Sequence, residues 1–193
     1  MNKPLLRLLS ASLLFPTLAF AHSSGTGAHD FKTGFLHPFS GLDHLLAMLA
    51  VGLWASQLGG RAKWQVPLTF VAVMAVGSLI GIKGGSLPLM ESGITMSLLV
   101  VGVMIAASIR LPLAFSCALV GIFALCHGAA HGAELPFATR AVLYATGFLL
   151  ATALLHLTGI VCANHLKHIN RDSLLRWLGG LIAVSSGYFW LNI

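Results

Sequence analysis

Charged side chains are scarce in this chain of 193 residues, because only 8% are Asp, Glu, Lys or Arg while 57% are hydrophobic. Soluble domains usually contain about 25% charged residues, so this composition excludes a water-soluble globular protein and predicts a membrane protein. The eleven basic residues give a net charge of +6, but they are too scattered to follow a phosphate backbone. We therefore expect a lipid bilayer as a partner and no nucleic acid.

Cysteine and nucleotide-binding motifs are also lacking. Cys117, Cys126 and Cys162 form neither a Cys-x-x-Cys motif nor a disulfide framework, so we expect them to be small apolar helix residues. The sequence contains no Gly-x-x-x-x-Gly-Lys-Ser/Thr loop, which predicts that the chain alone does not hydrolyse nucleotides. The short connections leave no room for a soluble catalytic domain, and we do not expect an enzyme.

The N-terminus has the pattern of a secretory signal peptide. Two basic residues precede an apolar run over residues 8–18, and Ala19-Phe20-Ala21 matches a small-x-small cleavage pattern. We expect residues 1–21 to be removed and residues 22–193 to form one transmembrane domain. An uncleaved signal anchor is the alternative, and in either case the following segment begins outside the cytoplasm.

Hydropathy divides the rest of the chain into six apolar segments, which predicts an all-α, polytopic membrane protein with six transmembrane helices. The segments are residues 38–58, 66–82, 89–109, 111–130, 140–162 and 174–192. Most are near the roughly 20 residues that a helix needs to cross the hydrocarbon core. Prolines lie at the predicted helix ends, where a missing N–H costs least: Pro38, Pro67, Pro88, Pro112 and Pro136.

The basic residues predict the orientation of these segments. If the mature N-terminus is outside, the inner connections hold Arg61, Lys63, Arg110, Lys167, Arg171 and Arg176, and the outer segments hold Lys32, Lys83 and Arg140. An excess of Lys and Arg is typical of cytoplasmic loops. We therefore expect both mature termini to be extracytoplasmic.

Glycine, in contrast, is plentiful, with 21 residues. The patterns Gly77-x-x-x-Gly81 and Gly128-x-x-x-Gly132 predict close helix contacts. Three plus three segments would permit an inverted repeat, but the two halves show no convincing self-similarity.

The first cluster of ionisable residues lies at the outer start of the first segment, in His37-Pro38-Phe39-Ser40-Gly41-Leu42-Asp43-His44. Such residues are costly within a membrane and indicate a functional site. On one helix His37 and His44 differ by only about 20°, with Met48 on the same stripe. Asp43 points about 100° away from His44, so it must contact a neighbouring helix or join the site through a local distortion. A merely polar helix start is the structural alternative.

The second cluster ends the fourth segment, in Cys126-His127-Gly128-Ala129-Ala130-His131-Gly132-Ala133-Glu134. His127, His131 and Glu134 lie on one helix stripe and could share a metal ion, although a structural hydrogen-bond patch is the alternative. The predicted topology places both clusters at the outer face. Nitrogen and oxygen ligands suit nickel, cobalt or zinc better than copper(I). The predicted metal ligands are His37, Asp43, His44, His127, His131 and Glu134.

These two motifs resemble the signatures of the HupE/UreJ family of small bacterial nickel permeases, His-x5-Asp-His in the first span and His-Gly-x-Ala/Val-His-Gly-x-Glu in the fourth. The resemblance extends to the signal peptide, the six spans and the length. It implies secondary transport of Ni²⁺ across the bacterial inner membrane for hydrogenase or urease, with no tightly bound cofactor. Co²⁺ and Zn²⁺ are alternative substrates, and the role allows an intracellular metal acceptor and an oligomer. Cys126 departs from the family, which commonly has an aromatic residue there.

Histidines outside the two motifs have less specific roles. His22, His29 and Glu91 are candidates for a secondary metal site on the outer side. His156, in the fifth segment, is expected to form an interhelical hydrogen bond, with an exit-side relay as the alternative. His165 and His168 are expected in an inner loop, either solvated or releasing metal.

Two other functions use the same residues. In a membrane-embedded zinc hydrolase, the histidines would hold the ion and Glu134 would act as the base. A haem-b protein would use paired histidines, but His127 and His131 on one helix cannot ligate opposite faces of a haem. For transport, imidazoles must be unprotonated to bind metal, so uptake should fall as the pH drops through about 6.5.

Overall fold

The computed structural model describes residues 27–85, 90–135 and 140–191, and these ranges contain helices and no strand. The helices are α2 (Gly27–Ser40), α3 (Leu42–Leu58), α4 (Ala62–Ile82), α5 (Met90–Ala106), α6 (Leu113–Ala133), α7 (Ala141–His168) and α8 (Asp172–Trp190). The prediction of an all-α fold is confirmed for this part of the chain. The predicted signal peptide lies outside the described residues.

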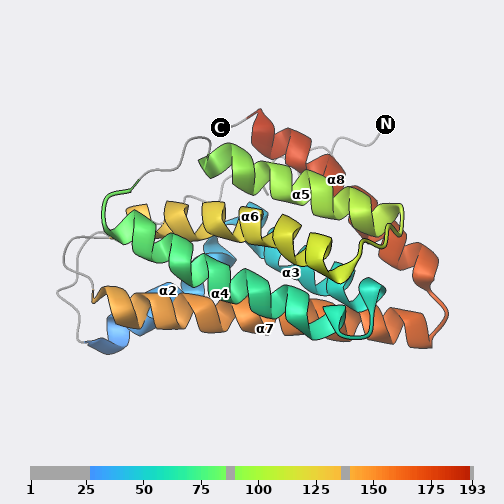
Figure 1. Ribbon diagram of the computed structural model, residues 1–193, viewed down its shortest axis with the longest axis horizontal. Helices are drawn as coiled ribbons and strands as arrows, with labels where there is room; N and C mark the ends of the chain where they lie inside the picture. Colours follow the sequence, from blue (N-terminus) through green and yellow to red (C-terminus); the bar gives the residue numbers. More distant parts are fainter. Residues whose placement is uncertain (1–26, 86–89, 136–139, 192–193) are drawn as a thin grey trace, which may run out of the picture.

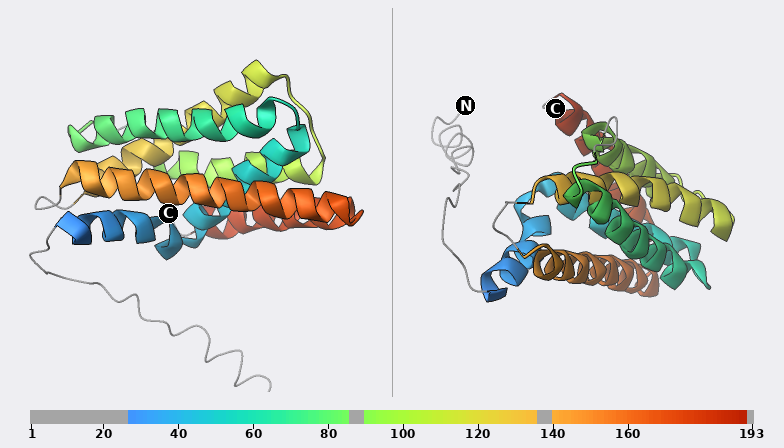
Figure 2. Two further views of the ribbon diagram at one scale, coloured as in Figure 1. Left: turned by 90° about the horizontal axis from the view of Figure 1, so that it is seen from below. Right: turned by 60° about the vertical axis from the view of Figure 1, so that its left-hand side comes forward.

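The helices form a bundle in which α3 to α8 run in alternating directions along the long axis (Figures 1 and 2). The connections α3–α4, α5–α6 and α7–α8 lie at one end of the bundle, which we call the basic end (Figure 1). The starts of α2 and α7 and the end of α6 lie at the opposite end, which we call the cluster end, and α3 begins further inside the bundle, beside α7 (Figure 1). Within the bundle, α3 packs against α2, α4, α5, α7 and α8.

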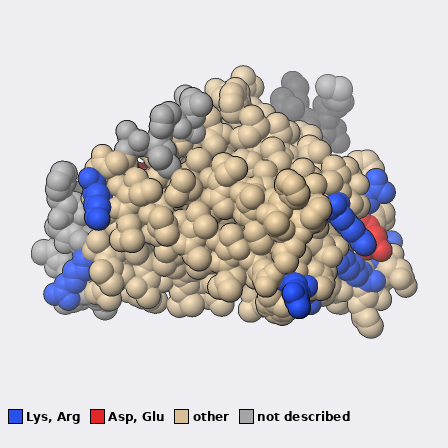
Figure 3. Space-filling view, viewed as in Figure 1, with Lys and Arg blue, Asp and Glu red and all other residues tan. Residues whose placement is uncertain are grey.

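The surface between the two ends is apolar. Figure 3 shows Lys and Arg at both ends of one face and none across its middle. Large apolar side chains are exposed on several helices, including Leu68, Ile122, Val161 and Val184. Water would disfavour so much exposed apolar surface, whereas lipid chains accommodate it.

Three helices, α4, α6 and α7, are long and apolar enough to cross a bilayer. The bent pair α2–α3 provides a fourth candidate if it is a single span, and α5 is apolar but has only 17 residues. The described helices therefore support a membrane protein with three or four candidate spans, and six spanning helices stay a prediction.

Glycines allow the closest helix contacts. The two predicted glycine patterns pack against each other: a Cβ on Gly77 or Gly81 would collide with the backbone of α6, and one on Gly128 or Gly132 with that of α4. Because these glycines have no side chains, the backbones of α4 and α6 can come into contact. Glycines also permit close contacts in three other helix pairs, α2–α7, α3–α7 and α5–α8, through Gly34 and Gly147, Gly52 and Gly159, and Gly102 and Gly179.

Several predicted helix boundaries are wrong. Pro38 lies inside α2, near its end, instead of starting the next helix, and Pro67 lies inside α4, which already begins at Ala62. The segment 38–58 is not one helix, because the extended backbone of Gly41 separates α2 from α3 at an angle of 83°. A proline lacks an N–H and a glycine is flexible, so together they favour ending a helix here.

Candidate metal centre

The break between α2 and α3 positions the first histidine pair. His37 comes from the last turn of α2 and His44 from the first turns of α3, and their ring centroids are 6.4 Å apart. The prediction that the two share one helical stripe is wrong. They nevertheless approach each other, because the bend redirects the chain between them.

Asp43 and His44 form a pair that needs the glycine before them. His44 Nδ1 lies 2.8 Å from Asp43 Oδ1, and a Cβ on Gly41 would lie 2.8 Å from that carboxylate oxygen and 2.9 Å from that ring nitrogen. The start of α3 is thus the local distortion that brings two adjacent side chains together. Because a carboxylate only accepts hydrogen bonds, the ring proton is on Nδ1 and Nε2 keeps its lone pair. His44 Nε2 is buried and has no hydrogen-bond partner.

His127 is oriented by a serine that the sequence did not single out. The Ser97 hydroxyl donates to the Ile94 carbonyl at 2.6 Å and lies 3.2 Å from His127 Nε2. Since the serine proton is already used, Ser97 Oγ accepts from His127 Nε2–H. His127 Nδ1 therefore keeps the lone pair, and it too is buried without a partner.

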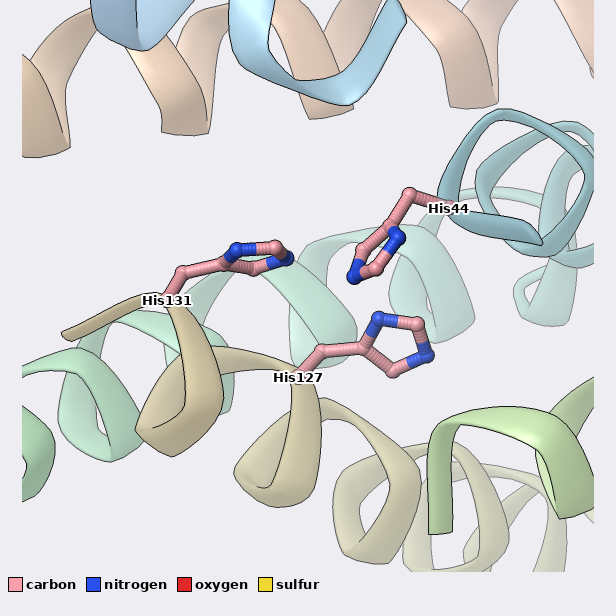
Figure 4. Close-up of side chains that lie close together, drawn as sticks. All are labelled: His44, His127 and His131. Atoms are coloured by element: carbon pink, nitrogen blue, oxygen red, sulfur yellow. The ribbon is translucent and has the colours of Figure 1, made fainter. Parts of the chain in front are cut away.

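Three imidazoles converge in the interior, and we call His44, His127 and His131 the three-histidine group. Figure 4 shows the rings from α3 and α6 turned toward one another. Each offers a ring nitrogen within 4.8 Å of the other two. His127 and His131 are at most 2% exposed. Converging imidazole nitrogens without a thiolate suit a borderline divalent cation.

A second group, the outer group, consists of His37, His131 and Glu134. His37 Nε2 lies 2.8 Å from His131 Nδ1, and Glu134 Oε2 lies 3.4 Å from His131 Nδ1 and 3.7 Å from His37 Nε2. Glu134 caps the end of α6, and its side chain is 61% exposed. The outer group is thus accessible at its carboxylate and buried at His131, which belongs to both groups.

The structure brings some of the nine predicted site residues together and leaves others apart. Five of the six principal candidates fall into the two groups, whereas Asp43 contacts a group member and belongs to neither. Glu91 is exposed in the first turn of α5 and also belongs to neither group. His22 and the side chain of His29 lie outside the described residues.

Aromatic side chains surround the histidines and were not predicted. The Phe148 ring lies 4.5 Å from that of His131, and the Tyr144 ring 5.8 Å from that of His37. Phe70 contacts His127 at 5.6 Å between centroids. Aromatic residues are common in apolar helices, so nothing in the sequence marks these particular ones as part of a site. Ser97 is different, because a polar serine within an apolar segment is a signal that could have identified it.

Cys126 adjoins the site in sequence but faces elsewhere. A Cβ on Gly93 of α5 would lie 2.7 Å from Cys126 Sγ, so the thiol packs at the α5–α6 contact. Its sulfur belongs to neither histidine group. The small side chain fits beside glycine, in agreement with its expected packing role.

The remaining histidines lie on α7. His156 Nδ1 is 2.7 Å from the Met48 carbonyl of α3, which confirms the predicted interhelical hydrogen bond. His165 and His168 are exposed in the last turns of α7, so their placement in a loop is wrong. The helix continues past the predicted end at residue 162, because a helix can extend beyond its apolar segment into water.

A polar network closes the basic end between α3 and α7. The Lys167 ammonium donates to the Ser56 carbonyl and lies 3.3 Å from Ser56 Oγ. The Ser56 hydroxyl donates to Asn164 Oδ1 at 2.9 Å. A fixed positive charge thus ties the two helices together where they leave the apolar part of the bundle.

Two comparisons with known proteins give matches that cover most of the chain. The family model described as HupE / UreJ protein matches residues 10–189. The chain is 44% identical over 175 residues to Protein HupE of Rhizobium leguminosarum bv. viciae, and the alignment covers 91% of each chain. No solved structure matches the chain.

Proposed function

This chain belongs to the HupE/UreJ family, and from that premise we propose that it is a permease that imports Ni²⁺ across the bacterial inner membrane. The family is associated with nickel and cobalt transport for hydrogenase and urease. The observation that carries the proposal is the three-histidine group, in which His44 and His127 each direct an unpartnered lone pair inward. Buried polar atoms without partners are rare in native proteins, and a transported cation would satisfy these.

The proposed orientation places the cluster end outside the cytoplasm. Six basic residues lie in or beside the connections of the basic end, and three lie in the outer segments, so the basic end is the cytoplasmic one. In this arrangement α3 to α8 cross the membrane after removal of residues 1–21. Ions then reach the outer group first and leave past the basic end.

Capture begins at the outer group. The exposed Glu134 carboxylate attracts a hydrated dication, and the half-buried His37 replaces part of its water. The carboxylate also lowers the cost of bringing a divalent charge toward the membrane interior. Oxygen and nitrogen donors together suit nickel or cobalt.

Transfer inward passes through His131. A neutral imidazole has one lone pair, so His131 can ligate through Nδ1 in the outer group or through Nε2 in the three-histidine group, but not through both at once. The two groups therefore hold one ion at a time. Moving inward requires the His131 proton to shift from Nε2 to Nδ1, while Asp43 and Ser97 keep the rings of His44 and His127 oriented.

Accumulation of labelled nickel tests the proposal in cells that lack their own nickel importers. We expect wild-type protein to increase uptake, and His44→Ala and His131→Ala to return it to the background. His165→Ala is the matched control, because His165 is an exposed histidine on α7 away from both groups. Competition by Co²⁺ and Zn²⁺ measures selectivity.

Two results would contradict the proposal. One is wild-type expression, verified in the membrane, that leaves nickel uptake unchanged. The other is normal uptake by both His44→Ala and His131→Ala, which would show that transport does not use this site.

A further inference from the structure

His156 is a fully buried histidine outside both metal groups. It is 1% exposed, and its Nε2 has no hydrogen-bond partner. On the preceding turn of α7, Thr152 is 0% exposed, and its Oγ1 is likewise unpartnered. Residues four apart lie on one helix face, so an imidazole and a hydroxyl lacking partners occupy the same buried surface.

The hydrogen bond of His156 determines which ring nitrogen is free. Its Nδ1 lies 2.7 Å from the Met48 carbonyl, which can only accept. The ring proton is therefore on Nδ1, and the unpartnered Nε2 carries a lone pair. A histidine that donates through one nitrogen to a backbone carbonyl while offering the other is the usual arrangement of a metal ligand. The same deduction applies to His44.

His156 lies deeper in the bundle than the three-histidine group. Its partner Met48 is one turn beyond His44 on α3, or about 6 Å further along the helix. Phe70 links the two places, because its ring is 5.6 Å from the His127 ring and 5.1 Å from the His156 ring. The direction from His44 to Met48 leads toward the basic end (Figure 1).

The α3–α7 contact fixes this position. A Cβ on Gly52 would collide with the His156 carbonyl, and one on Gly159 with the Leu49 carbonyl. The two backbones therefore touch beside His156. Close approach of the helices allows the ring to reach the Met48 carbonyl.

We propose that His156 and Thr152 form a relay site that receives the divalent cation from the three-histidine group on its way to the basic end. The inference rests on the proposed function. His156 Nε2 supplies one ligand and Thr152 Oγ1 contacts the ion or a water bound to it. Two protein donors leave the ion partly hydrated, so it is held briefly and released. The relay site would divide the ion's path through the apolar part of the bundle, from the outer face to the network of Lys167, into two shorter steps.

The test separates the free nitrogen from the hydrogen bond. His156→Asn keeps an N–H near the position of Nδ1, where it can donate to the Met48 carbonyl, but lacks the second ring nitrogen. We expect purified His156→Asn in proteoliposomes to import Ni²⁺ about tenfold more slowly than wild type. Equilibrium binding of labelled Ni²⁺ to the detergent-solubilised protein should stay within about twofold, because the three-histidine group is intact.

Thr152→Val is a second variant that does not endanger folding. The hydroxyl has no hydrogen-bond partner, so its replacement by a methyl group of similar size loses no internal bond. We expect about fivefold slower import, the equivalent of one hydrogen bond to a water molecule bound to the passing ion. His165→Asn is the matched control on the same helix and should import at the wild-type rate.

The outcomes distinguish the relay from the permease. Import by both His156→Asn and Thr152→Val within twofold of wild type, alongside inactive His44→Ala, would overturn the relay and leave the proposed function intact. Loss of Ni²⁺ binding in both variants would assign a structural role to this surface and also overturn the relay. Absence of import by the wild-type protein would overturn the proposed function and the relay together.

Discussion

The two ends of the α3–α7 helix pair hold partly buried polar groups of opposite character. At the cluster end, His44 presents a lone pair, and Asp43 adds a negative charge behind it. At the basic end, Lys167 places a positive charge between the helices and is held by Ser56. In the proposed permease, a dication would be stabilised at the cluster end and repelled at the basic end.

In the proposed permease, the α3–α7 pair would bind the ion at one end and release it at the other. The cluster end is preorganised, because hydrogen bonds orient its rings before an ion arrives. At the basic end the network of Lys167, Ser56 and Asn164 connects α3 directly to α7. In the proposed permease, an ion that leaves between these two helices would have to displace these contacts. Variants at the cluster end should therefore alter metal binding, and variants at the basic end should alter stability or rate.

His131→Ala should have the largest effect on the cluster end, because it removes the residue shared by both groups. Loss of a supporting residue typically costs 10–100-fold in metal affinity, and loss of a ligand should cost more than about 100-fold. Equilibrium binding of labelled Ni²⁺ measures the effect. His37→Ala is the informative comparison, because it leaves the three-histidine group complete and should retain tighter binding. Equal losses in the two variants would argue against separate groups.

Asp43→Asn tests whether the negative charge behind His44 supports binding. The amide has nearly the shape of the carboxylate, but it is neutral and its nitrogen cannot accept the ring proton. We expect Ni²⁺ affinity to fall by about tenfold, with thermal stability nearly unchanged. An affinity equal to wild type would mean that Asp43 only caps α3. Gly41→Ala, whose Cβ would collide with the pair, should lower affinity in the same direction.

Much of this architecture could be predicted from the sequence, because lipid exposure imposes long apolar segments. The glycine patterns of α4 and α6 also predicted a real contact, since close packing requires small side chains at helical spacing. The break at Gly41 could not be predicted from hydropathy, because both sides of the break are apolar. It depends on how α2 packs against α7, which is a tertiary contact.

In the site, too, features that follow from helical spacing could be predicted, and features that depend on tertiary contacts could not. His127 and His131 are one turn apart on one helix, so their proximity follows from spacing alone. The roles of Asp43 and Ser97 depend on contacts that spacing does not determine: Asp43 was predicted as a ligand but contacts His44, and Ser97 was not predicted at all. The division into two groups sharing His131 likewise required the positions of α2 and α3 relative to α6.

Acidification should weaken the binding of Ni²⁺ at the cluster end. Protonation removes the lone pair that binds metal, so binding is present at higher pH and is lost as the pH falls. We expect Ni²⁺ affinity to decrease by about tenfold or more between pH 7.5 and pH 5.5. Binding measured in detergent at both pH values checks this. Undiminished binding at about pH 5 would argue against imidazole ligands.

Lys167→Met tests the basic end. The variant keeps the length of the side chain but loses the ammonium and its bonds to Ser56, which should lower the free energy of unfolding by about 1–2 kcal/mol. For a protein of this size, the thermal midpoint should decrease by several degrees. Ni²⁺ affinity should remain within about twofold, because the Lys167 ammonium contacts Ser56, which is about 18 Å along α3 from His44. A large loss of affinity would show that the two ends are coupled.

Cys126→Ser should have the smallest effect and tests the chemistry of the cluster end. The thiol is adjacent to His127 in sequence, yet its sulfur faces Gly93 instead of the histidines. If nitrogen and oxygen atoms alone bind the ion, the variant should bind Ni²⁺ within about twofold of wild type, whereas loss of a direct ligand would cost far more. The electronic spectrum of the Co²⁺ complex provides a second measurement, because a thiolate ligand adds an intense near-ultraviolet band. That band should be absent from wild type and variant alike, and a band that disappears on replacement of Cys126 would place sulfur in the site and remove the basis for excluding copper(I).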